Sequence, residues 1–61
     1  MSYLVRLMNE YDELSERIYK LEKYLAKGDV NDERLLLSQL HYMQGYKMVL
    51  KIRLRKEGYD V

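Results

Sequence analysis

The feature that most constrains this chain is a run of apolar residues in its first half, spaced alternately three and four positions apart. The run consists of Leu4, Leu7, Tyr11, Leu14, Ile18, Leu21 and Leu25. This spacing forms one continuous stripe along an α-helix and is typical of helices that pack against other helices. Because the chain has no proline, nothing in it forbids a long helix. The pattern predicts a helix over about residues 2–27, with Ser2 as its N-cap.

Charge pairs and a glycine support this helix and mark its end. Two pairs place a glutamate four residues before a cation: Glu13 with Arg17 and Glu16 with Lys20. Such pairs stabilise a helix. Lys27 followed by Gly28 is typical of a helix end, because a cation suits the last turn and glycine readily adopts the conformation that follows it.

A second helix is expected over about residues 32–57, after a loop at 28–31. Asn31 is its predicted N-cap, and Asp32 and Glu33 put negative charge where the helix dipole favours it. Its apolar residues form two stripes: Leu36, Leu40, Met43, Leu50 and Leu54, and, offset from these, Leu35, Tyr42, Tyr46 and Val49. So short a loop makes consecutive helices antiparallel. The predicted fold class is therefore all-α, a single antiparallel helical hairpin over residues 1–61.

The second helix and the size of the chain both indicate self-association. Two apolar stripes form a wider face than one partner helix covers. A chain of 61 residues rarely gains enough stability from its own core, since the usual lower limit is about 70–80 residues. Without cysteine it has neither disulfides nor thiolate zinc sites, and one histidine does not make a metal site. We expect a homo-oligomeric helical bundle.

Two residue choices fit such a bundle. All seven aromatic residues are tyrosines, which combine a flat ring with a polar tip and suit half-buried interfaces. Gly45 lies inside the second predicted helix, where glycine costs about 1 kcal/mol relative to alanine. The cost is either simply tolerated or it permits close approach by another backbone or a ligand. We favour close approach by another helix.

The sequence has no feature of an enzyme, and we predict none. His41 is the only imidazole, no glycine-rich phosphate loop is present, and the acidic residues at 10–13 are typical of a solvated helix face. We expect no cofactor and no metal. No apolar run approaches the roughly 18 residues that span a bilayer, and the beginning of the chain does not resemble a signal peptide. A cytoplasmic protein with no membrane contact is expected.

Cations gather near the end of the second helix. Lys47, Lys51 and Arg55 share one face, and Arg53 and Lys56 flank them. One interpretation is a solvated face that complements the negative end of the helix dipole. The other is an anion site for phosphate, a nucleotide or nucleic acid.

Three stretches of the chain carry a resemblance to a known family. They are E-x-x-E-L-x-x-R-I-x-x-L over residues 10–21, Y-L-x-x-G over 24–28, and Q-L-x-x-M-x-x-Y-x-x-x-L-x-x-R over 39–53. In these stretches the chain resembles the phage anti-CBASS cyclic-nucleotide sponges and related small phage proteins. The resemblance implies a helical homo-oligomer, specifically a hexamer, that binds cyclic dinucleotides or trinucleotides between protomers in the bacterial host cell and so starves an immune effector of its signal.

The resemblance also implies site residues. Tyr11 matches a tyrosine that stacks on a base, Lys27 matches a lysine that meets phosphate, and Arg53 matches an arginine of a second site for cyclic trinucleotides. Tyr11 and Lys27 are about 24 Å apart along one helix, so they belong to one site only if an antiparallel neighbour supplies its own Lys27. The alternative functions are a protein-interaction module, in which the wide face of the second helix binds another helix, and a nucleic-acid-binding module of a phage or mobile element.

Overall fold

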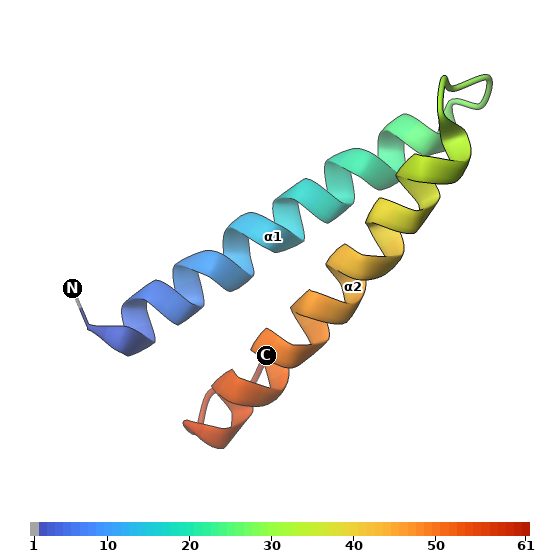
Figure 1. Cartoon of the computed structure of the whole chain (residues 1–61). Coiled ribbons are helices and arrows are strands. Elements are labelled where there is room, and N and C mark those ends of the chain that lie inside the picture. Colours follow the sequence, from blue (N-terminus) through green and yellow to red (C-terminus); the bar gives the residue numbers. More distant parts are fainter. Residues whose placement is uncertain (1) are drawn as a thin grey trace.

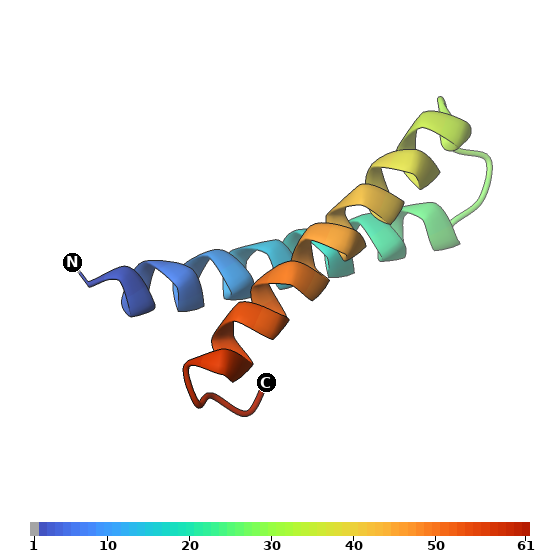
Figure 2. The same ribbon diagram turned by 60° about the horizontal axis from the view of Figure 1, so that its bottom comes forward.

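A computed structural model describes residues 2–61 as two antiparallel α-helices joined by a short loop (Figure 1). Helix α1 spans Tyr3–Ala26 and helix α2 spans Glu33–Lys56. No strand is present in the described part of the chain. The predicted all-α hairpin is therefore confirmed. The helices cross at an angle, and their free ends separate on the side away from the loop (Figure 2).

The ends of α1 follow from local chemistry. The side chain of Ser2 accepts a hydrogen bond from the backbone N–H of Val5 at 3.2 Å, so the predicted N-cap is confirmed. At the other end, Gly28 has a φ of +74°, which glycine adopts without steric cost. The two predicted charge pairs are present on the solvent side: Glu13–Arg17 at 3.8 Å and Glu16–Lys20 at 3.1 Å.

The beginning of α2 differs from the expectation. Asp32, and not Asn31, is the N-cap, and its side chain makes no capping hydrogen bond. Asp29 and Asp32 have φ values of +52° and +57°, a left-handed conformation that aspartate tolerates better than most residues. The chain therefore reverses through left-handed residues, and the backbone of Asp32 cannot take the extended conformation that a side-chain cap requires.

Helix α2 ends in a Schellman motif. Gly58 has a φ of +94°, its N–H donates to the carbonyl of Arg55 at 3.0 Å, and the N–H of Tyr59 donates to the carbonyl of Leu54 at 3.0 Å. The chain then folds back, because Arg55 Nε donates to the carbonyl of Val61 at 3.0 Å. Val61 packs against the hydrophobic core.

The core lies along the line where the two helices face each other. Its buried residues are Leu7, Leu14, Ile18, Leu50 and Leu54. Leu7, Leu14 and Ile18 come from the apolar stripe predicted for the first helix, and Leu50 and Leu54 come from the first of the two stripes predicted for the second helix. The remaining members of these stripes are only half-buried. A core of five side chains leaves much of the apolar surface uncovered.

The hairpin has more surface than a compact chain of its mass. Its accessible surface is 4910 Å², against about 4,200 Å² expected for 7.5 kDa. Its radius of gyration is 13.6 Å, against about 10.5 Å for a compact domain of this length. The whole offset stripe of α2, Leu35, Tyr42, Tyr46 and Val49, is exposed. No helix in the described residues is long and apolar enough to cross a membrane.

Candidate functional site

A pocket of about 310 Å³ lies between the two helices at the end away from the loop. It is lined by Tyr3, Arg6, Leu7 and Glu10 of α1 and by Tyr46, Leu50 and Arg53 of α2. Leu7 and Leu50 are core residues, so the base of the pocket is apolar. The other lining residues are polar, and their side chains are exposed or, for Glu10, half-buried.

Arg53 and Tyr3 are joined across the pocket. Arg53 Nη2 donates a hydrogen bond to the hydroxyl of Tyr3 at 2.6 Å. The guanidinium carbon also lies 5.5 Å from the centroid of the Tyr3 ring, within the range of a cation–π interaction. These two contacts hold the arginine at the pocket wall.

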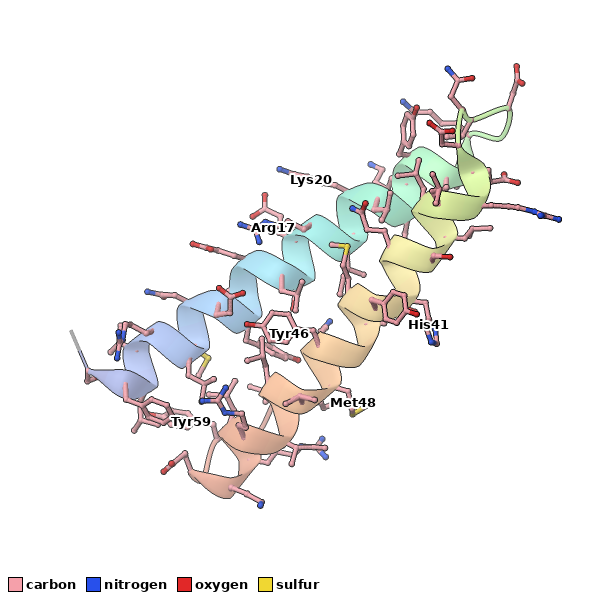
Figure 3. The ribbon with its side chains drawn as sticks, viewed as in Figure 1. Arg17, Lys20, His41, Tyr46, Met48 and Tyr59 are labelled. Carbon is pink, nitrogen blue, oxygen red and sulfur yellow. The ribbon has the colours of Figure 1, made fainter. Side chains whose placement is uncertain are left out.

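Glu10 and Tyr46 form the second polar pair of the pocket. Tyr46 extends from α2 toward α1, whereas His41 and Met48 extend away from it (Figure 3). Partial burial raises the pKa of the Tyr46 phenol above its ordinary value, the nearby Glu10 carboxylate raises it further, and Arg53 acts in the opposite direction. Tyr46 is therefore a neutral hydrogen-bonding group at physiological pH.

The charges of the pocket favour an anionic ligand. Arg6 and Arg53 are cationic and Glu10 is the single anion among the lining residues. Within residues 2–61 the ion pairs lie on the solvent side of α1, so neither arginine is neutralised by a carboxylate. Two guanidinium groups with free donors can grip a phosphate group through paired hydrogen bonds.

Of the three predicted site residues, the structure places only Arg53 in this pocket. Tyr11 lies beside it, packed against the core, and Lys47 Nζ lies 5.5 Å from the centroid of the Tyr11 ring. Lys47 is half-buried because it occupies the gap in the apolar stripe between Met43 and Leu50. One face of the Tyr11 ring is thus already covered by a cation.

Lys27 lies at the opposite end of the hairpin. It is the C-cap of α1, and its Nζ is 5.9 Å from the ring of Tyr24. One hairpin therefore does not bring Lys27 near Tyr11 or Arg53. A shared site with Tyr11 stays a prediction that depends on a neighbouring copy.

The sequence interpretation missed four pocket residues: Tyr3, Arg6, Glu10 and Tyr46. A signal for them exists in the spacing. Tyr3, Arg6 and Glu10 are three and four positions apart, and Tyr46, Leu50 and Arg53 are four and three apart, so each set shares one face of its helix. Polar residues that continue an apolar stripe toward the free end of a hairpin face the partner helix.

The cationic face of α2 is only partly available to an extended polyanion. Lys47 is held over Tyr11, and Arg55 donates to the carbonyl of Val61. In the part of the chain that the structure describes, no group of three or more His, Cys, Asp or Glu side chains is arranged to hold a metal ion. The pocket is the better candidate for a binding site.

The fold and the pocket together define a small helical hairpin whose two helices enclose a pocket lined by two arginines, two tyrosines and one glutamate. The model of the Sequestin family matches residues 1–56, and the chain belongs to this family. Sequestins are phage proteins that sequester cyclic nucleotides, and they act by binding. The resemblance to phage cyclic-nucleotide sponges is thereby confirmed. No curated protein and no solved structure shows significant similarity to the chain.

Proposed function

We propose that this chain sequesters a cyclic dinucleotide or trinucleotide immune signal in the bacterial cytoplasm and so antagonises anti-phage defence. The observation that carries the proposal is the pocket between the helices, in which Arg6 and Arg53 lie beside the rings of Tyr3 and Tyr46. Membership of the Sequestin family supports the class of ligand.

The pocket residues match the parts of a nucleotide. Guanidinium groups form paired hydrogen bonds with phosphate oxygens. A tyrosine ring stacks on any base, and such stacking contributes about 1–3 kcal/mol per base. Glu10 offers only acceptor atoms, which suit the N–H groups of a base edge or the hydroxyl of a ribose. Leu7 and Leu50 provide the apolar base against which a ring can lie.

The size of the pocket favours one nucleotide unit in each hairpin. At about 310 Å³ it is at the small end of ligand sites, which range over about 300–1,000 Å³. A cyclic dinucleotide has two bases and two phosphates, so two copies of the pocket are needed to surround it. A homo-oligomer with two-fold axes presents each residue twice and supplies such a pair. The hexamer implied by the family resemblance contains such pairs if it has dihedral symmetry.

The predicted pairing of Tyr11 with Lys27 of a neighbouring copy is a second location for the same ligand. Tyr11 is one turn of α1 from the pocket residue Leu7, so a base that displaced Lys47 and stacked on the Tyr11 ring would lie close to the pocket. In this arrangement Lys27 contacts phosphate and the pocket arginines do not. Variants at Lys27 and at Arg53 therefore separate the two locations.

The test is a thermal-shift scan of the purified protein against a panel of cyclic dinucleotides and trinucleotides, with linear dinucleotides as controls. A ligand that binds only the folded state raises Tm, and the increase grows with the logarithm of the ligand concentration divided by its Kd. We expect an increase of Tm for cyclic species alone, and calorimetric titration of the best ligand should give one dinucleotide per two chains. No shift with any cyclic nucleotide would contradict the proposal.

A second measurement separates sequestration from degradation. Ligand incubated with the protein and then released by heat should be recovered intact by chromatography, because the pocket has a hydrogen-bonding and stacking role only. Recovery of a linear product would show hydrolysis and would contradict a sponge function.

A further inference from the structure

The side of α2 that faces away from α1 is apolar over most of its length. We name the outer face of α2 as the side chains from Ser38 to Ile52 that lie within about 60° of Gly45 around the helix axis, taking about 100° per residue. It consists of Ser38, His41, Tyr42, Gly45, Met48, Val49 and Ile52. Tyr42, Met48, Val49 and Ile52 are 76%, 55%, 52% and 49% exposed. The outer face thus presents large apolar side chains directly opposite the hairpin core.

No Asp, Glu, Lys or Arg interrupts the outer face. Arg34 and Lys56 lie on the same side of the helix just beyond its two ends, and between Ser38 and Ile52 it extends over about four turns. The corresponding side of α1 is different, because it carries Asp12, Glu16 and Lys23. Two helices of the same hairpin would be expected to have similar solvent-facing sides. The difference indicates that the outer face of α2 is covered by a partner.

Gly45 points to the form of that partner. A methyl group added at Gly45 would meet no atom of the chain within 4 Å, so nothing inside the hairpin requires a glycine there. Glycine nevertheless weakens the helix in which it lies. A bare backbone in the middle of an apolar face permits another helix to approach closely, which a side chain would prevent.

We infer that the outer face of α2 packs against the outer face of α2 from a second copy, with the two helices crossing at Gly45. Gly45 lies at the middle of Glu33–Lys56, so a two-fold axis through it superimposes the whole outer face on itself. Ser38, Tyr42, Gly45, Val49 and Ile52 are spaced four, three, four and three apart, the spacing of a helix–helix seam. A crossed arrangement also keeps Arg34 of one copy away from Lys56 of the other, because the helix ends splay apart.

The surface area favours a second copy as the partner. The hairpin exposes roughly 700 Å² more than a compact chain of its mass, which is close to the about 800 Å² that each partner contributes to a stable interface. The contact also leaves the pocket accessible, since Tyr46 extends toward α1 and not into the outer face (Figure 3). This inference rests on the self-association included in the proposed function and assigns it to one surface.

The test compares Gly45→Leu and Ile52→Glu with the unmodified protein by sedimentation analysis across a range of concentrations, without nucleotide. Each variant should weaken self-association by roughly tenfold or more, because one fills the crossing point and the other puts a charge into an apolar contact. Asn9→Leu and Asn9→Glu make matched changes at an exposed position on the outer side of α1 and should leave association unchanged. Circular dichroism at high dilution checks that every variant remains helical.

Gly45→Ala gives the sharpest outcome. Alanine favours the helix, so in a dilute, dissociated sample this variant should have a higher Tm than the unmodified protein, while its association is weaker. A stable monomer at all concentrations of the unmodified protein, or unchanged association of both Gly45→Leu and Ile52→Glu, would overturn the inference. Because association is measured without ligand, a failure of nucleotide binding would not change the conclusion about the outer face. In the same way, a failure of association through the outer face would not contradict nucleotide binding.

Discussion

Arg53 donates a 2.6 Å hydrogen bond to the hydroxyl of Tyr3, although 50 positions separate the two residues in the chain. The contact links the first turn of α1 to the last turns of α2, where no covalent connection is near. It also fixes one of the two pocket cations against the ring beside it. The same pair therefore contributes to the hairpin and to the candidate site.

Replacing Tyr3 with phenylalanine should separate these two contributions. The ring and its cation–π contact remain, and only the hydrogen bond is lost. Because Tyr3 is 48% exposed, water replaces much of the lost bond, and the free energy of unfolding should fall by no more than about 0.5–1 kcal/mol. Urea unfolding measures this change. Arg53 also loses one of its two contacts with residue 3 and is held less firmly, so nucleotide affinity should decrease while the ligand preference stays the same.

The location of the phosphate site can be tested with matched cation variants. Arg53→Gln and Arg6→Gln should each lower the affinity for the cyclic nucleotide by about tenfold or more, since a hydrogen bond to a charged group contributes about 1.5–3 kcal/mol. Lys27→Gln removes one charge from the other end of the hairpin and should have little effect. Isothermal titration calorimetry measures all three. Loss of binding in Lys27→Gln alone would instead place the ligand between Tyr11 and the Lys27 of a neighbouring copy.

The Tyr46 phenol should ionise above the ordinary pKa of a tyrosine. Its pKa is raised above the ordinary value of 10.0 by partial burial and by Glu10, so the folded state holds this proton more tightly than the unfolded state does. The resulting stability is complete below the unfolded pKa and is lost as the pH rises through the folded pKa. An alkaline titration followed by phenolate absorbance should lose a component above the ordinary tyrosine pKa in Tyr46→Phe.

Glu10→Gln provides the control for this titration. It removes the negative charge near the phenol and should lower the pKa of Tyr46 without bringing it fully to the ordinary value, because burial is the larger cause. An unchanged titration curve in Glu10→Gln would show that the carboxylate does not act on Tyr46 in solution.

The difference in burial between Leu54 and Leu37 predicts a difference in how much each stabilises the fold. Leu54 has no exposed surface, so Leu54→Ala should lower the free energy of unfolding by about 2–5 kcal/mol and leave much of a chain this small unfolded. Leu37 lies on the same helix but is 49% exposed, and Leu37→Ala should change stability by less than about 0.5 kcal/mol. Thermal unfolding followed by circular dichroism compares the two. Similar losses in both would mean that the buried seam does not dominate stability.

The helices and the core could be predicted because their signals are local. The three-and-four spacing that includes Leu7, Leu14 and Ile18 depends only on the pitch of a helix, and these residues are indeed buried. The prediction of Asn31 as the N-cap of α2 was wrong because the position of this cap is not set by local sequence. Whether Asn31 or Asp32 begins the helix depends on how the loop reverses, and the left-handed backbone of Asp32 is set by the helices that the loop must join.

The spacing of the pocket residues shows which of them share a face of one helix, but which residues of the other helix they meet depends on how the hairpin brings the two helices together. Tyr3 and Arg53 are unremarkable in their own segments and meet only when the register of the two helices is known. Lys47 shows the same effect. As part of a repeat with Lys51 and Arg55 it was interpreted as either a solvated cationic face or an anion site, whereas in the hairpin it replaces an apolar residue in the seam and covers Tyr11. Arg53 was predicted from the family resemblance, not from any local pattern.

The loop and the pocket are at opposite ends of the hairpin, so the angle between the helices at the loop sets the distance between their free ends at the pocket. Each helix is about 36 Å long, so a rotation of about 5° at the loop moves the far ends by about 3 Å. A change of this size at the left-handed residues Gly28, Asp29 and Asp32 would therefore shift the two walls of the pocket relative to each other, unless packing between Leu7, Leu50 and Leu54 resisted it. Substitutions in the loop, far from any ligand, should therefore alter the size of the ligand that the pocket accepts.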